Sequence, residues 1–235
     1  MNDFRTRYAT PSDLGVRPST ELSAGFLTQA FGWMFAGLLL TAGVAALVNT
    51  NQGLLAGVAG LWLPIIIAQL ALVLVISAAS RRLSATAALG LFFVYAASVG
   101  LTVGVIVSLF AQASVATAFL SASAMFGAAA IYGAVTKRSL ASMRGYLTMG
   151  LVGLIVAMVL NIFLNSGPLG FVISIAGVVI FTALTAYDVQ RIASGDLAAG
   201  LGSMEKAAVI GALSLYLDFI NLFLFMLRIF GSGRD

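Results

Sequence analysis

The chain contains no cysteine and no histidine among its 235 residues. Without cysteine it can form no disulfide bond and no thiolate site for a metal or a redox reaction. Without histidine it lacks the side chain that most often titrates near neutral pH, and also the commonest zinc ligand. Any response to protons must therefore come from carboxylates, and no resident cofactor is expected.

Charge is scarce as well. Only 9% of the residues are charged, 61% are apolar and the mean hydropathy is +1.08, whereas a soluble domain carries about 25% charged residues. This composition predicts an integral membrane protein whose solvent is the lipid bilayer. In such a protein the net charge of +4 is informative only through the side on which Lys and Arg lie. No basic run or nucleic-acid-binding motif is present, so no nucleic-acid partner is expected.

The positions of the charges divide the chain into spans. Three uncharged stretches are each long enough for two membrane helices of about 20 residues, and they cover residues 22–80, 83–136 and 145–187. Turn-forming residues divide them at 49–53, 111–114 and 165–168. A further span runs to Arg228. The sequence therefore predicts an all-α membrane protein with a polar tail over residues 1–22 and seven transmembrane helices within residues 23–235.

Because each helical hairpin returns the chain to its starting side, the tail and the three charged loops share one side. That side carries ten of the twelve Lys and Arg residues, and Arg228 and Arg234 are the other two. The positive-inside rule then predicts a cytoplasmic amino terminus and a carboxyl terminus on the opposite side. Small residues within the spans predict close helix contacts; they are Gly32 with Ala36, Gly100 with Gly104, and Gly127 with Ile131 and Ala134.

The last span, residues 205–230, places Asp218 in the middle of an apolar run. An aspartate at the centre of a membrane helix costs roughly 2.5 to 3.5 kcal/mol, so it normally faces a protein or water-filled interior. Gly211, Ser214, Asp218 and Asn221 recur at helical spacing and form one small, polar face. We therefore expect this helix at the centre of the bundle, surrounded by the first six. Ser214 and Asn221 are candidates for polar lining, or for hydrogen bonds that pack helices.

A second carboxylate, Asp188, ends the sixth span and lies three residues before Arg191 on the same helix face. It forms either a water-exposed pair with Arg191 or an inward-facing group that approaches Asp218. Two carboxylates in a low dielectric cannot easily both ionise, so such a pair shares a proton, whereas a nearby guanidinium favours ionisation. Arg81, Arg82 and Arg191 are the candidates for that guanidinium.

The segments AYDVQRI at 186–192 and LSLYLDFINLFLFMLRIFG at 213–231 resemble the Bax inhibitor-1 family of membrane proteins, in its bacterial branch. The likeness extends to LPIII at 63–67, to the loop arginines and to the spacing of the spans. The resemblance implies a central last helix, a pH-responsive pair at Asp188 and Asp218, and a calcium leak through the bundle. It also implies an arginine at the end of the second span that latches the pair, which leaves Arg81 and Arg82 open.

The expected function is a pH-sensitive cation leak channel of a bacterial inner membrane, with calcium as the expected ion and Asp188 and Asp218 as its transient ligands. Gln69 stands where some relatives have a glutamate, and it is a further polar lining candidate. No enzyme activity is expected, because the residues before Asp218 do not match the Gly-x-Gly-Asp motif of intramembrane aspartyl proteases. A retinal protein would need a lysine inside the last helix, and Lys206 lies only at its mouth. The serious alternative is a non-conducting regulatory protein that docks on a membrane protease or another channel.

Overall fold

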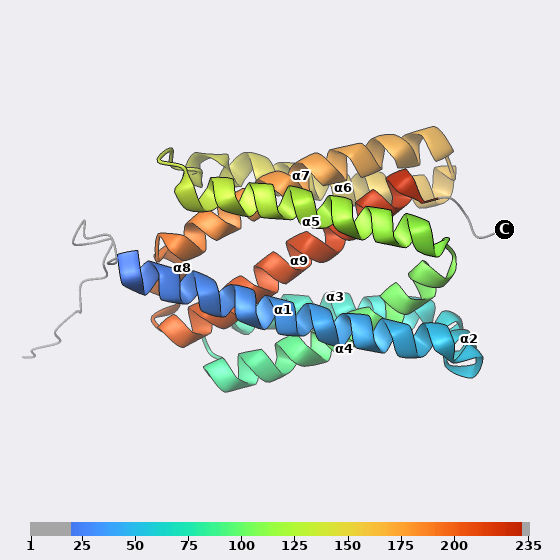
Figure 1. Cartoon of the computed structure of the whole chain (residues 1–235), viewed down its shortest axis with the longest axis horizontal. Helices are drawn as coiled ribbons and strands as arrows, with labels where there is room; N and C mark the ends of the chain where they lie inside the picture. The colour runs from blue at the N-terminus through green and yellow to red at the C-terminus, as the bar shows by residue number, and fades with distance from the viewer. Residues whose placement is uncertain (1–19, 232–235) are drawn as a thin grey trace, which may run out of the picture.

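The computed structural model describes residues 20–231, except for the side chains of residues 20–24 and 26, and the elements of this part are helices (Figure 1). They are α1 (Thr20–Thr50), α2 (Gln52–Gly60), α3 (Trp62–Ala79), α4 (Ala85–Ser108), α5 (Gln112–Val135), the 3₁₀ turn η1 (Ala141–Met143), α6 (Arg144–Leu164), α7 (Gly167–Ala193), α8 (Asp196–Leu201) and α9 (Met204–Phe230). Seven are long and apolar enough to cross a membrane: α1, α3, α4, α5, α6 with η1, α7 and α9. The predicted all-α fold with seven spans is confirmed. Most of the predicted tail, residues 1–22, lies outside the described residues.

The predicted turns fall where helices end, and polar side chains cap several of the helices that follow a connection. The Ser84 hydroxyl accepts a hydrogen bond from the backbone N–H of Ala87 at the start of α4, and Ser166 does the same for Leu169 at the start of α7. Such caps satisfy backbone N–H groups that have no partner inside the helix. Asn165, between α6 and α7, has a φ of 46°, the left-handed conformation that commonly ends a helix.

The turn between the first two spans contains an additional short helix, α2, which the sequence analysis did not predict. The side-chain oxygen of Asn51 caps it by accepting from the N–H of Leu54 at 3.0 Å. The break between α2 and α3 at Leu61 has a covalent cause. Pro64 lacks the N–H that would donate to the carbonyl of Gly60 in a continuous helix.

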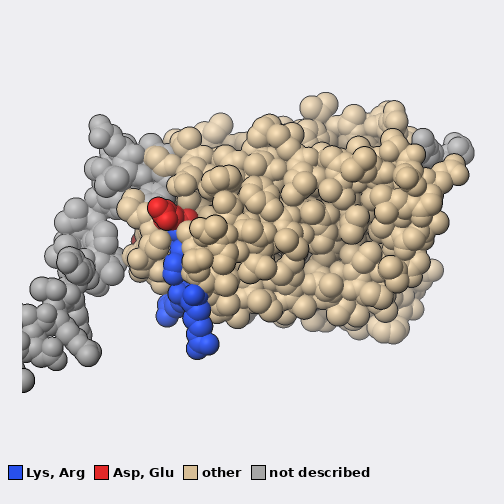
Figure 2. All heavy atoms as spheres, turned by 90° about the horizontal axis from the view of Figure 1, so that it is seen from below, with Lys and Arg blue, Asp and Glu red and all other residues tan. Residues whose placement is uncertain are grey.

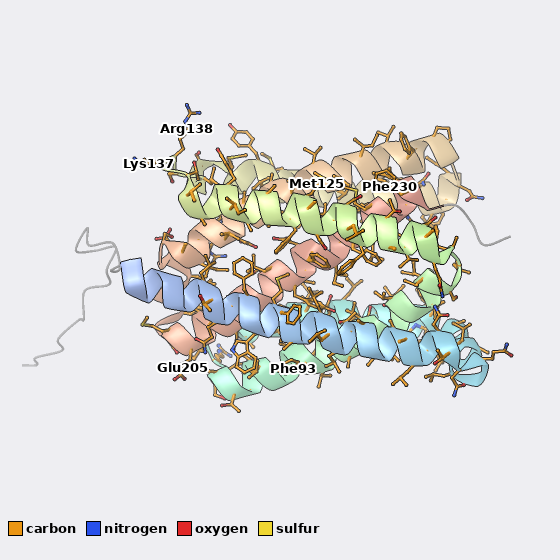
Figure 3. All side chains as sticks on the ribbon, in the orientation of Figure 1. Phe93, Met125, Lys137, Arg138, Glu205 and Phe230 are labelled. Atoms are coloured by element: carbon orange, nitrogen blue, oxygen red, sulfur yellow. The ribbon has the colours of Figure 1, made fainter. Side chains whose placement is uncertain are left out.

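The charged connections gather at one end of the bundle. The beginning of α1 and the α3–α4, α5–α6 and α7–α9 connections lie at the left in Figure 1, and the α1–α2 turn and the end of α9 lie at the right. In Figure 3, Lys137, Arg138 and Glu205 lie at the left end, where Lys137 and Arg138 point outwards. Phe230 lies towards the right end. On the face seen in Figure 2, charged side chains occupy one end and the remainder is uncharged. This distribution suits a bundle whose long sides face lipid.

Helix α9 is the most buried span. Of its most apolar stretch 72% is buried, against 6% for α3 and 11% for α6. It runs diagonally between α1 and α5 (Figure 1) and packs along α1, α4, α5 and α7, whereas α3 packs chiefly on α4, and α6 on α7. Four earlier spans therefore form an inner layer around α9, and α3 and α6 lie outside it, rather than all six surrounding it equally.

Glycines set the closest helix approaches. A Cβ on Gly100 would lie 2.8 Å from the Thr41 carbonyl oxygen of α1, and one on Gly104 2.9 Å from that of Ala45. Gly133 of α5 lies against the Ala186 backbone of α7. Two of the other predicted small-residue sites, Gly32 and Gly127, face open space instead. The Gly133 contact fixes α7 beside α5 two residues from Asp188, so it positions the candidate site.

Candidate functional site

The polar face of α9 contains a buried acid. Asp218 is 4% exposed, and its Oδ2 has no hydrogen-bond partner within residues 20–231. Buried polar atoms are almost always paired, so an unpaired carboxylate oxygen points to a bound proton, an ion or a functional role. Its position follows from the helical spacing of Gly211, Ser214 and Asp218, which turns these residues away from the bulky apolar side chains of the helix.

Helix α7 brings the second acid to this face. Asp188 is partly buried and lies close enough to Asp218 for the two carboxylates to interact electrostatically. The Ser214 hydroxyl of α9 donates a hydrogen bond to the Asp188 carboxylate. Small residues permit this approach, because the Ile192 side chain of α7 packs directly over Gly211. The structure therefore brings together three of the residues singled out in the sequence: Asp188, Ser214 and Asp218.

The arginines are not arranged as the family resemblance implies. Arg191 acts electrostatically on Asp188, and so does Arg144 at the first residue of α6. Arg81 and Arg82 are exposed in the α3–α4 turn, and the contact there is made by Lys206, whose Nζ donates to the Arg81 carbonyl at 3.2 Å. Within residues 20–231 no hydrogen bond or ion pair joins either of these two arginines to the aspartates. Of the latch candidates, only Arg191 is placed beside the pair.

Two residues near the site were not singled out from the sequence. Arg144 follows the charged residues Lys137 and Arg138, and it begins a span at the same end of the bundle as Asp188. Gln190, two residues after Asp188, accepts from the N–H of Leu140 at 2.7 Å and donates to the Arg138 carbonyl at 2.8 Å. It ties α7 to the α5–α6 connection. The sequence indicated Gln190 only through its place in the AYDVQRI segment. A glutamine at a helix end can form many different hydrogen bonds, so its partners could not be predicted.

The remaining lining candidates make structural hydrogen bonds. The Nε2 of Gln69 donates to the Ser98 carbonyl at 2.7 Å and to the Thr102 hydroxyl at 3.3 Å, which joins α3 to α4. The Nδ2 of Asn221 donates to the Leu217 carbonyl of its own helix at 2.8 Å. Neither amide donates to an aspartate, so neither belongs to the pair in this conformation.

The pair supplies too few ligands for a tight metal site. Within the described part of the chain, no group of three or more Asp, Glu, His or Cys residues is placed to hold a metal ion. Calcium takes six to eight oxygen ligands, so two carboxylates need water or other oxygens to complete its shell. A transient contact with a cation fits this arrangement, and a tight metal cage does not.

Seven helices long and apolar enough to cross a membrane, with two carboxylates where α7 meets α9, define an integral membrane protein with ionisable groups inside the bundle. The family model described as inhibitor of apoptosis-promoting Bax1 matches residues 23–235. The chain therefore belongs to the Bax inhibitor-1 family.

Relatives match most of the chain. A protein of Deinococcus radiodurans is 46% identical over 211 residues, which are 89% of this chain and 91% of its own length. The inner membrane protein YbhL of Escherichia coli is 41% identical over 236 aligned positions, covering 95% of this chain and 97% of its own length. A membrane protein of Streptococcus pyogenes is 44% identical over 167 residues, covering 71% and 72%.

Proposed function

We propose that the protein is a cation leak channel, with calcium as the main ion, whose opening depends on the protonation of Asp188 and Asp218. The observation that carries this proposal is the Oδ2 of Asp218, which is buried and has no hydrogen-bond partner in the described part of the chain, while a second carboxylate interacts with it from α7. The resemblance stated above supports it. The protein acts without a resident cofactor and without enzyme chemistry.

The pair would control the contact between α7 and α9. Two carboxylates away from water are held together by a shared proton, and full ionisation separates them by repulsion and frees oxygens for a cation. Arg191 and Arg144 lie within electrostatic range of Asp188, and a guanidinium competes with a proton for a carboxylate. The two helices therefore have a closed arrangement and a separated one, and pH sets the equilibrium between them.

A weak site suits a leak. Conduction requires that an ion binds well enough to enter and loosely enough to leave. Two carboxylates, the Ser214 hydroxyl and water would give a calcium ion a partial shell. Asn221 could join it after exchanging its bond to the Leu217 carbonyl.

We further propose that the end of the bundle carrying Arg82, Lys137 and Asp196 faces the cytoplasm of a bacterial inner membrane, and that α9 ends on the opposite side. The support is the collection of basic residues at that end. In this orientation Asp188 lies near the cytoplasmic end of α7, so the pair responds chiefly to cytoplasmic pH.

The test is calcium flux into liposomes that contain only the purified protein, measured with an enclosed calcium-sensitive dye over a range of pH. Asp218→Asn keeps the shape and removes one titrating group, so it should lower the flux and flatten its pH profile. Asp188→Asn should alter the closed state more than the conducting one. Glu205→Gln is the matched control, because it makes the same chemical change at an exposed acid in the first turn of α9.

The sign of the pH effect is informative in itself. A flux that rises as the pH falls means that the arginines hold the pair closed, because protonation of the aspartates releases the arginines. A flux that rises in base means that the shared proton holds it. Wild-type flux and pH profile in Asp218→Asn would refute the two-aspartate gate. Liposomes with no flux at any pH would favour the alternative, a regulatory protein that docks on other membrane proteins.

A further inference from the structure

A cavity of about 560 Å³ lies between α1, α4, α5 and α9 at the end of the bundle opposite the charged connections. Most of its wall is apolar, with Phe219, Ile220 and Phe223 supplied by α9. Its volume falls in the range of ordinary ligand sites, about 300 to 1,000 Å³.

The cavity is separate from the aspartate pair. Successive residues of an α-helix are about 100° apart, so Phe219, Ile220 and Phe223 lie on average about 150° around α9 from Asp218. The helix itself therefore stands between the two sites. None of the cavity's lining residues is Asp, Glu, Lys or Arg, so the cavity offers no ligand set for a bare cation.

The length of the cavity is comparable to one leaflet of a bilayer. On α1 it extends from Leu38 to Thr50, which is about 18 Å at 1.5 Å per residue. Half of a bilayer's hydrocarbon core is about 15 Å. Its polar lining residues are distributed accordingly: Asn49, Thr50 and Gln112 lie at the helix ends. Towards the inner end, the Thr41 hydroxyl is already hydrogen-bonded to Ala96 and Tyr216.

The cavity opens towards the side of the bundle. Ala42 and Ala46 line it and are exposed. Helices α1 and α5 each pack along α9 but, within residues 20–231, share no extended interface. Figure 1 shows α9 running behind the space between them. In a membrane the surroundings at this depth are lipid chains, and apolar cavities of this kind exclude water.

We propose that this cavity is a binding site for one acyl chain of a membrane lipid, which inserts between α1 and α5 and contacts Phe223 of α9. The amides of Asn49 and Gln112 lie at the level of the lipid's uncharged ester groups and can donate hydrogen bonds to them. The proposal rests on the cavity alone and does not depend on ion conduction.

The test uses bromine quenching of a single tryptophan in the full-length protein. Trp33 and Trp62 are the two native tryptophans, and both are replaced by phenylalanine. Phe223→Trp then reports on the cavity, and Phe225→Trp is the buried control on the same helix, with exposures of 6% and 5%. Phe163→Trp, at an 82% exposed position, reports on bulk lipid. Each variant is placed in vesicles of dioleoyl phosphatidylcholine and of the same lipid with brominated chains.

An acyl chain in the cavity predicts that bromination quenches Phe223→Trp almost as strongly as Phe163→Trp, while Phe225→Trp loses little fluorescence. Adding Ala45→Phe, which fills the cavity from α1, should lower the quenching of Phe223→Trp. Phe225 packs closely on Gly177, so a tryptophan at position 225 can prevent folding. The comparison of Phe223→Trp with and without Ala45→Phe does not need that variant. Equal weak quenching at 223 and 225 would overturn the proposal. So would quenching of Phe223→Trp by aqueous acrylamide in place of brominated lipid, since it would show a water-filled cavity.

Discussion

A hydrogen-bond chain joining three helices allows a sharp prediction about stability. The Thr41 hydroxyl donates to the Ala96 carbonyl at 2.9 Å and lies 2.6 Å from the Tyr216 hydroxyl, and both hydroxyl residues are buried. A threonine hydroxyl has one proton to donate. Because that proton goes to Ala96, Tyr216 must be the donor to Thr41.

The direction of the chain makes the two ends unequal. Tyr216→Phe removes a donor and leaves Thr41 bonded to Ala96, so its cost is that of one interhelical hydrogen bond, about 0.6 kcal/mol and at most about 1.7. Thr41→Val leaves the Tyr216 hydroxyl buried without an acceptor, which costs about 1 to 3 kcal/mol. The double variant removes both hydroxyls, so it should be no less stable than Thr41→Val alone.

Unfolding in mixed detergent micelles with increasing dodecyl sulfate, followed by circular dichroism, measures these differences. Thr117→Val is the matched control, because this exposed threonine donates only within its own helix, to Ala113. It should change the free energy of unfolding by less than about 0.5 kcal/mol. A Tyr216→Phe cost equal to or above that of Thr41→Val would refute the assigned direction of the bond.

Two further predictions concern the topology and the helix contacts. In this cysteine-free chain, Lys137→Cys should be labelled by an impermeant thiol reagent from the cytoplasmic side and Thr50→Cys only from the other, and labelling of both from one side would contradict the topology. Gly133→Ala should destabilise the protein by about 1 to 3 kcal/mol in the same unfolding assay, because the added methyl group meets the Ala186 backbone. Gly127→Ala, on the same helix but in open space, should be neutral or slightly stabilising, and equal effects of the two changes would refute the close approach of α5 and α7.

The number of spans was predictable because charge and apolar length are local properties of a membrane sequence. Uncharged stretches that hold two spans each, with turn residues in the middle, leave few other arrangements. The face of α9 was predictable for a similar reason, since Ser214 and Asp218 stand out among bulky apolar neighbours. Helical spacing alone puts these two residues on one face of α9, and in the structure that face meets α7.

The outer positions of α3 and α6 could not be predicted from the pattern. Helices that are apolar all round carry no stripe that separates a lipid-facing side from a protein-facing side. The position of Arg144 could not be predicted for another reason. Arg81, Arg82, Arg144 and Arg191 all lie at the same end of the bundle. Arg191 follows Asp188 by three residues on α7, whereas only the packing of α6 against α7 brings Arg144 into range of Asp188.

The exact position of the acid along α9 decides whether it lies beside Asp188. An acid moved from position 218 to position 219 would turn by about 100° around α9. It would then occupy the place of Phe219, whose ring packs edge-on against Phe119 and Phe126 of α5 at centroid distances of 5.7 and 5.5 Å. There it would meet aromatic rings in place of Asp188. At position 218 the acid faces Asp188 of α7, so the two groups can share a proton, and Arg191 and Arg144 partly balance the charge of Asp188.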